Sequence, residues 1–176
     1  MERLNTTIRE FQFDDWKEIH KYASQERACI YQPWGPNSEK DTKEFARMII
    51  ENTQDEPRTR FAFVVTIEED SRVIGAGEVN IRNIRNRNGE ISYIINPRYW
   101  GNGYASEVAR FLLEFGFSKL KLHRIYATCD PRNIASSKVL EKMGMEYEGR
   151  MRDTLLIRDG WRDSLLYSIL ENEWVL

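Results

Sequence analysis

Cysteine and histidine are scarce in this chain of 176 residues, which contains two of each. Cys29 and Cys129 form no C-x-x-C pair, so we expect no disulfide framework. His20 and His123 have no partner at metal-ligand spacing, and we expect no metal site. Without a nearby histidine to activate it, Cys129 is expected to be a small buried hydrophobe rather than a nucleophile.

Long apolar runs and a strong excess of one charge are also missing. No stretch approaches the ~18 apolar residues that span a bilayer, and the first residues lead into no apolar signal region. The formal net charge of -2 offers no broad basic surface for nucleic acid. We therefore expect a cytoplasmic protein with neither a membrane nor a nucleic-acid partner.

The composition that remains is that of a globular chain. Apolar residues make up 41% and charged residues 31%, and the length suits one domain over residues 1–176. Monomer and homodimer are both open.

Periodicity predicts an α/β (α+β) fold. Four helices are expected. The first is capped by Asp14, the second and third cover residues 38–52 and 103–118, and the fourth is capped by Asn133 and ends at Gly144. A loop is expected over residues 29–37. Turns are expected over residues 68–71, 83–89 and 158–160. Strands are expected over residues 6–11, 61–67, 72–81, 90–95, 124–129, 147–157 and 161–170. This order predicts a mixed sheet of about seven strands with helices on both faces.

The sharpest motif is a glycine-rich segment between a strand that ends at Pro97 and an amphipathic helix. Glycines at 101 and 103 let the backbone approach a ligand closely, and the helix N-terminus presents N–H groups and partial positive charge. Arg98 can add a guanidinium. A turn that only caps the helix is the simpler alternative.

Two other phosphate motifs do not fit this segment. No Lys-Ser or Lys-Thr follows the glycines, as a mononucleotide P-loop requires. Ser106 replaces the third glycine of a dinucleotide fingerprint, and no acid lies about 20 residues later.

The segment Arg98-x-x-Gly101-x-Gly103 resembles the [QR]-x-x-G-x-[GA] acetyl-CoA loop of the GCN5-related N-acetyltransferases (GNATs). Further segments of the chain resemble the branch that acetylates the N-termini of ribosomal proteins, over about residues 61–167. They are Tyr99-Trp100-Gly101-Asn102-Gly103-Tyr104-Ala105-Ser106-Glu107, Leu122-His123-Arg124, Asn133-Ile134-Ala135-Ser136, Leu140-Glu141-Lys142-Met143-Gly144, Glu148-Gly149, Arg152-Asp153 and Asp159-Gly160-Trp161.

The resemblance implies a GNAT-like, mostly antiparallel sheet with a splay between its fourth and fifth strands, and acetyl-CoA as cofactor. It implies that the free backbone of the fourth strand pairs with the pantetheine arm and that the glycine loop holds the diphosphate. Asn133 and Ser136 are expected beside the thioester, although both can equally be structural at the start of a helix. The implied cofactor-binding residues are Tyr93, Ile94, Ile95, Arg98, Trp100, Gly101, Asn102, Gly103, Tyr104, Ala105, Ser106, Asn133 and Ser136.

Acetyl transfer to an amine requires a base, oxyanion stabilisation and a proton for the departing thiolate. Glu90 is the first candidate base and Glu78 the reserve, with a cross-strand ion pair as the structural alternative. Main-chain N–H near Ile95 is the expected oxyanion donor. Many relatives use a tyrosine on the helix after Asn133 as the acid; this chain has none there, so Ser136 is the available hydroxyl.

Acceptor-site residues are expected where similar proteins border the acceptor pocket. Tyr31 and Trp34 follow the first helix, Tyr167 lies on the last strand, and Glu78 completes the set. Trp34 and Tyr167 can equally have only a packing role. Some ribosomal-protein transferases carry a carboxylate where this chain has Leu155 or Leu156. The leading hypothesis is an N-acetyltransferase acting on a primary amine, such as a protein N-terminus. The alternatives are a small-molecule amine (a polyamine, aminoglycoside or amino acid) and a non-catalytic acyl-CoA sensor.

Overall fold

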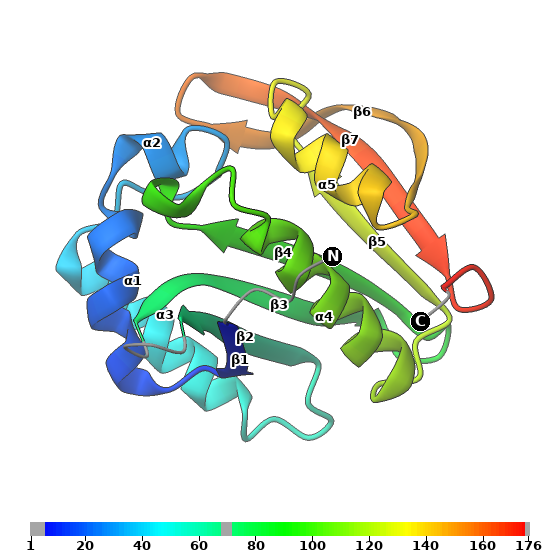
Figure 1. Cartoon of the computed structure of the whole chain (residues 1–176), viewed down its shortest axis with the longest axis horizontal. Helices are drawn as coiled ribbons and strands as arrows, with labels where there is room; N and C mark the ends of the chain where they lie inside the picture. The colour runs from blue at the N-terminus through cyan, green and yellow to red at the C-terminus, as the bar shows by residue number, and fades with distance from the viewer. Residues whose placement is uncertain (1–5, 68–71, 175–176) are drawn as a thin grey trace.

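A seven-stranded sheet organises the chain in the computed structural model, which describes residues 6–67 and 72–174 (Figure 1). The elements, in order, are β1 (Thr6–Glu10), η1 (Phe13–Asp15), α1 (Trp16–Ala23), α2 (Glu26–Cys29), α3 (Glu39–Asn52), β2 (Arg60–Ile67), β3 (Val73–Asn83), β4 (Asn88–Ile95), η2 (Pro97–Tyr99), α4 (Tyr104–Ser118), β5 (Arg124–Cys129), α5 (Ile134–Lys142), β6 (Glu146–Ile157) and β7 (Gly160–Leu170). None of the helices in the described ranges is long and apolar enough to cross a bilayer.

The strands lie in the order β1-β2-β3-β4-β5-β7-β6, and all neighbours are antiparallel except β4 and β5. That parallel pair is short: it joins Asn88 through Glu90 to Arg124 through Tyr126 and then ends. Figure 1 shows the two strands meeting at one end and diverging toward the other. The predicted splay between the fourth and fifth strands is therefore confirmed.

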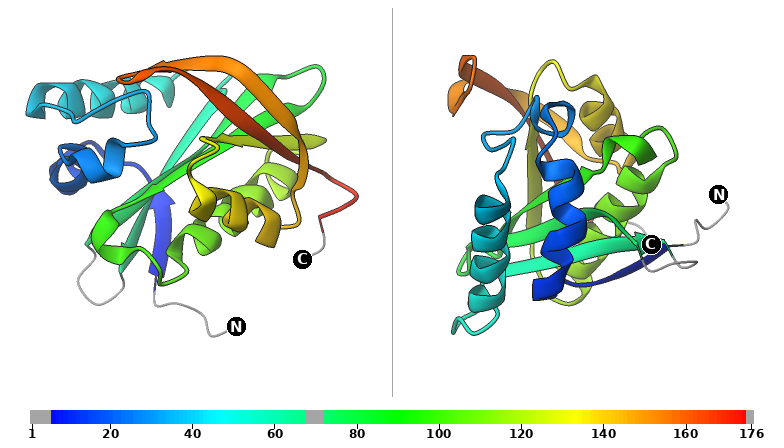
Figure 2. Two further views of the ribbon diagram at one scale, coloured as in Figure 1. Left: turned by 90° about the horizontal axis from the view of Figure 1, so that it is seen from above. Right: turned by 90° about the vertical axis from the view of Figure 1, so that its left-hand side faces the viewer.

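Helices cover both faces of the sheet, as predicted (Figure 2). The face under α4 and α5 is packed with large apolar side chains, and the opposite face packs against α1, α2 and α3. Fully burying one such side chain stabilises the fold by about 1.5–3 kcal/mol. The largest fully buried residues under α4 and α5 are Val65, Ile74, Val79, Ile91, Leu112, Leu113, Leu122, Ile125, Leu140 and Ile169.

Most predicted boundaries agree with the structure to within two residues. Two predictions were wrong. Asp14 caps no helix: it pairs with Lys17 in solvent, while the buried Asp15 accepts from the Gln12 N–H at 2.7 Å and binds Arg9. The predicted loop 29–37 also begins late, because residues 26–29 form the extra helix α2. The predicted turn at residues 68–71 lies outside the described residues.

Candidate active site

The loop between β4 and α4 is held in shape by its own side chains. Asn96 accepts the Arg98 N–H at 3.1 Å, and the Asn102 amide donates to the Tyr99 and Trp100 carbonyls at 3.2 Å each. Gly101 and Gly103 have φ of 82° and 87°, in the left-handed region that favours glycine. The loop therefore has its conformation before any ligand arrives.

This loop leaves backbone donors at the start of α4. The Ser106 and Glu107 N–H groups both bond to the Gly103 carbonyl, at 3.0 and 3.2 Å. The N–H groups of Tyr104 and Ala105, in the first turn, have no intrahelical partner. A Cβ at position 101 would meet nothing within 4 Å, and Gly101, Asn102 and Gly103 are exposed, so the loop before the helix is open to a ligand. Aligned donors at a helix N-terminus with open space in front suit the linked phosphates of acetyl-CoA.

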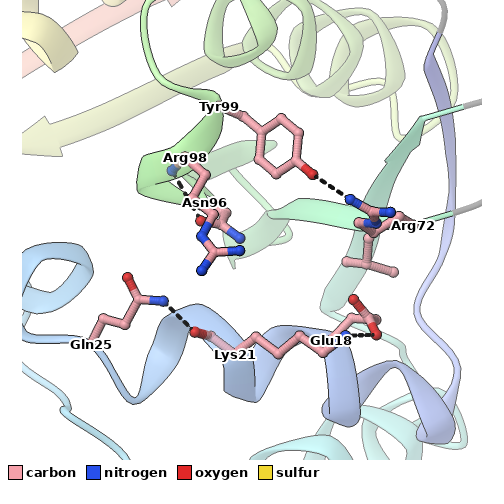
Figure 3. A pocket seen from close by; sticks show the side chains of 8 residues that line it. Glu18, Lys21, Gln25, Arg72, Asn96, Arg98 and Tyr99 are labelled. Atoms are coloured by element: carbon pink, nitrogen blue, oxygen red, sulfur yellow. Dashed lines mark hydrogen bonds and ion pairs between the residues drawn. The ribbon is translucent and has the colours of Figure 1, made fainter.

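Arg98 lies on the other side of this loop. Its side chain lines a cavity of about 410 Å³ between η2, the start of β3 and α1 (Figure 3). Lys21 and Arg72 line the same cavity, and Arg72 donates to the Tyr99 hydroxyl at 3.3 Å. The Arg98 guanidinium therefore faces α1, and its contact with a phosphate stays a prediction.

The parted strands present free backbone groups in the gap. The Asn96 N–H bonds to the Ile74 carbonyl on β3 at 2.8 Å. Since antiparallel pairing alternates, the backbone groups of Ile94 also turn to β3, whereas those of Tyr93 and Ile95 turn toward the gap. Of the three residues predicted to pair with pantetheine, Tyr93 and Ile95 thus have the required direction and Ile94 does not.

Ile95 is partly engaged already. Its carbonyl accepts from the Trp100 indole N–H at 2.7 Å, and the Arg27 guanidinium of α2 lies over the Trp100 ring at 5.1 Å. Trp100 was predicted to bind cofactor, but its indole N–H is bound within the protein. The Ile95 N–H still points into the gap, where the oxyanion donor was expected.

The other wall of the gap is the start of α5. Asn133 caps this helix by accepting the Ser136 N–H at 3.2 Å, so its structural role is observed. The Ser136 hydroxyl lies 3.2 Å from the Tyr93 hydroxyl, across the gap. Burial raises the pKa of Tyr93, partly opposed by the bond to Ser136. A tyrosine hydroxyl is therefore present beside Ser136, contributed by β4 rather than by the helix.

The two candidate bases lie on the opposite face of the sheet. Glu78 binds Arg60 with both carboxylate oxygens, at 2.8 and 2.9 Å. Glu90 lies on the last β4–β5 pair, and its described contacts, with Arg82 at 2.6 and 2.8 Å and the Tyr126 hydroxyl at 3.4 Å, all fall on Oε2. One oxygen of Glu90 thus remains available among the described residues, and neither oxygen of Glu78 does.

A second cavity, of about 530 Å³, opens on this face between α2 and the β6–β7 turn. Its lining mixes two carboxylates, two guanidinium groups, two isoleucines and an amide: Glu26, Arg27, Ile30, Gln32, Ile157, Arg158 and Asp159. The formal charges of these side chains cancel. The cavity therefore provides both apolar and polar contacts for an acceptor molecule, without an excess of either charge.

Sequence reasoning missed the residues that hold this wall together. Arg162, 8% exposed, donates to the Tyr31 carbonyl at 3.0 Å and lies 3.8 Å from Asp130. Arg132 bridges Asp130 and Asp159 at 2.8 and 2.9 Å. Burial alone would raise the pKa of Asp130, but the bonds and charges of Arg132 and Arg162 outweigh it and lower the pKa. The available signal was an acidic residue directly after a buried strand.

The residues predicted to bind the acceptor do not lie together in the structure. Tyr31 is tied to the wall through its carbonyl, and the Arg132 guanidinium lies 5.8 Å from its ring centroid. Trp34, 36% exposed, lies in the loop after α2. Tyr167 is 3% exposed, in the core under α5, where its hydroxyl donates to Glu141 at 3.2 Å. Tyr167 therefore lies on the wrong face for the acceptor cavity, because the alternation along β7 turns it toward α5.

Comparison with known proteins identifies the family of this chain. A family model described as an acetyltransferase (GNAT) domain matches residues 5–146. YnaD, an uncharacterized N-acetyltransferase of Bacillus subtilis (strain 168), is 38% identical over 167 residues, 95% of this chain and 94% of the relative.

Two solved structures with different substrates are equally similar in fold. Ribosomal-protein-S5-alanine acetyltransferase from Vibrio fischeri has a TM-score of 0.83 at 25% identity, covering 100% of this chain and 98% of its own. Spermidine N-acetyltransferase from Vibrio cholerae, in complex with CoA and spermine, has a TM-score of 0.83 at 24% identity, with coverages of 96% and 97%. At that last identity the likeness concerns the fold alone. The family match and the curated relative show that the chain belongs to the GNAT acetyltransferases, which use acetyl-CoA.

Proposed function

We propose that the chain transfers the acetyl group of acetyl-CoA to the N-terminal amine of a polypeptide. The observation that carries the choice of acceptor is the charge of the cavity between α2 and the β6–β7 turn. Its carboxylates are matched by Arg27 and Arg158, and Asp159 is already bound by Arg132. A polycation requires convergent, uncompensated acids, whereas a neutral residue behind an N-terminal amine does not.

The groups that act on the amine and on the leaving sulfur lie on opposite faces of the sheet. The amine approaches from the α2 face. Glu90 precedes Ile95 by five residues on β4, about 16 Å along the strand, so it accepts the proton of the amine through a chain of waters. The acyl carbon lies between β4 and β5, and the Ile95 N–H stabilises the negative charge that develops on its oxygen. On the α5 face, Ser136 supplies a hydroxyl to the departing sulfur. Acetyl-CoA supplies the thioester, and the N-terminus of α4 binds its phosphates.

Glu90 is the better base of the two carboxylates. Its oxygen Oε1 has no partner among the described residues, and its position at the closed end of the splay places it next to the point where the strands part. Glu78 is held by Arg60 through both oxygens, which fits a structural ion pair.

A small-molecule amine is the second candidate. The observation that favours it is the pair of carboxylates, Glu26 and Asp159, in the cavity.

An acceptor panel tests the proposal. Purified protein is incubated with acetyl-CoA and with N-terminal peptides, spermidine, an aminoglycoside or free amino acids, and thiol release is followed beside product mass. We expect acetylated peptides, and faster release with a neutral first residue than with polyamines. Acetylation of small amines with no reaction on any peptide would overturn the acceptor assignment. Acetyl-CoA binding without thiol release on any amine would favour a sensor instead.

A further inference from the structure

Tyr93 and Ser136 form a contact that bridges the parted strands. Tyr93 lies on β4 beyond the last β4–β5 pair, and Ser136 lies in the first turn of α5. Their hydroxyl oxygens are 3.2 Å apart. The contact joins two segments 43 residues apart in the sequence, and it lies at the wall of the gap that receives the thioester.

Ser136 is fixed at two points. Its N–H is held by the Asn133 side chain at 3.2 Å, and its hydroxyl by Tyr93. A serine hydroxyl otherwise rotates freely to suit its partners. Because both the backbone and the side-chain oxygen are held, the remaining freedom of Ser136 is the direction of its own proton.

The direction of the hydrogen bond follows from acidity. Either hydroxyl can donate in this contact. A phenol, with a pKa near 10, is a stronger donor than an aliphatic alcohol, and we therefore assign the donor role to Tyr93 and the acceptor role to Ser136. Burial raises the pKa of Tyr93 further, which keeps the phenol protonated at neutral pH. With its lone pair engaged by Tyr93, the Ser136 O–H is free to donate to a third group.

We propose that Tyr93 is a positioning residue that aims the Ser136 hydroxyl at the departing sulfur of acetyl-CoA; this rests on the proposed acetyl transfer. In that step the C–N bond forms and the C–S bond breaks. The sulfur keeps the electron pair and takes the Ser136 proton, and Ser136 regains a proton from water. Tyr93 keeps its own proton throughout.

Tyr93→Phe tests this inference, because it removes the hydroxyl and keeps the ring that packs against the core. We expect kcat to fall about tenfold, with KM for acetyl-CoA changed less than about twofold, since the hydroxyl acts on Ser136 rather than on binding. Tyr22→Phe is the matched control: it also removes a buried tyrosine hydroxyl, one without a partner among the described residues, and should leave kcat unchanged.

A double-mutant cycle separates positioning from a general structural effect. In a Ser136→Ala background, Tyr93→Phe should cost less than about twofold in kcat, because there is no hydroxyl left to aim. Thermal melting of each variant shows whether it is folded. An unchanged kcat in Tyr93→Phe, or a tenfold loss that persists in the Ser136→Ala background, would overturn the inference. Wild-type protein that releases no thiol with any amine would instead overturn the proposed function.

Discussion

The open end of the splay has two sides, a cofactor end that follows β4 and an acceptor end beside the end of β5, and they are built in different ways. The cofactor end is a continuous segment, residues 96–107, in which backbone N–H groups at the start of α4 face open space. The acceptor end joins distant segments, α2, the end of β5 and the β6–β7 turn, through the buried Arg162 and Asp130. A cofactor site made of backbone N–H groups depends on the conformation of the chain. An amine-binding site made of side chains depends on which residues occupy the positions. Substitutions at the first should affect every acceptor, and substitutions at the second should change which acceptor is used.

The largest effect is expected at Glu90, at the closed end of the splay. Glu90→Gln should lower kcat on the order of a hundredfold, because the amide cannot take the proton of the amine, while acetyl-CoA affinity stays the same. Steady-state kinetics beside calorimetric titration measure both. Glu78→Gln is the matched control and should lower kcat far less. Equal losses of kcat in the two variants would show that Glu90 is only a structural ion-pair partner of Arg82.

At the cofactor end, Gly101→Ala should weaken acetyl-CoA binding by roughly thirtyfold with every acceptor. Alanine at a φ of 82° is strained, so the loop and its donors shift. Gly144→Ala is the control: Gly144 ends α5 with a φ of 80°, and a Cβ there would make only an ordinary 3.8 Å contact with Ile169. Titration should find wild-type affinity in the control. A similar loss of affinity in both variants would mean that general backbone strain, and not the phosphate loop, sets binding.

At the acceptor end, Arg162→Met should raise KM for the acceptor about tenfold and leave acetyl-CoA affinity within twofold. The methionine fills similar volume but cannot bond the Tyr31 carbonyl, so the loop after α2 loosens. It should also lower the free energy of unfolding by about 2 kcal/mol, measured by urea titration. Loss of acetyl-CoA binding in a folded variant would show that the two ends are not independent.

The smallest effect is expected from a polar cluster between β5, β6 and β7. Bonds from Arg124 and then Ser168 lower the pKa of Glu148 from 4.5 to about 2. A lowered folded-state pKa contributes stability above the unfolded value, and this contribution is lost as pH falls from about 5 toward 2. Glu148→Gln should therefore melt about 2 °C below wild type at pH 7, a small shift because Glu148 is partly exposed. Melting curves at several pH values should converge near pH 2–3; a constant gap would contradict the assignment.

Local patterns were sufficient for most of the fold and for the position of the glycine loop before α4. The β5 boundaries, the Asn133 cap and the left-handed glycines follow from strand periodicity, capping chemistry and steric rules, which act within a few residues. The Asp14 cap failed because Asp15, one residue later, pairs with Arg9 from another element.

The acceptor end and the partner of Ser136 could not be predicted in the same way. The contact between Tyr93 and Ser136, and that between Arg162 and the Tyr31 carbonyl, depend on how the strands splay and how α2 sits on the sheet. Tyr167 was expected at the acceptor site but lies in the core under α5, because the face that each β7 side chain takes depends on the pairing of β7 with β5. Chemistry carried by distant side chains requires the tertiary arrangement.

The separation of Glu90 and Ser136 onto opposite faces of the sheet has a kinetic consequence. The gap between β4 and β5 can be reached from both faces of the sheet, so the amine can bind before coenzyme A leaves. Both reactants can occupy the enzyme together, and double-reciprocal plots at several fixed acceptor concentrations should give intersecting rather than parallel lines.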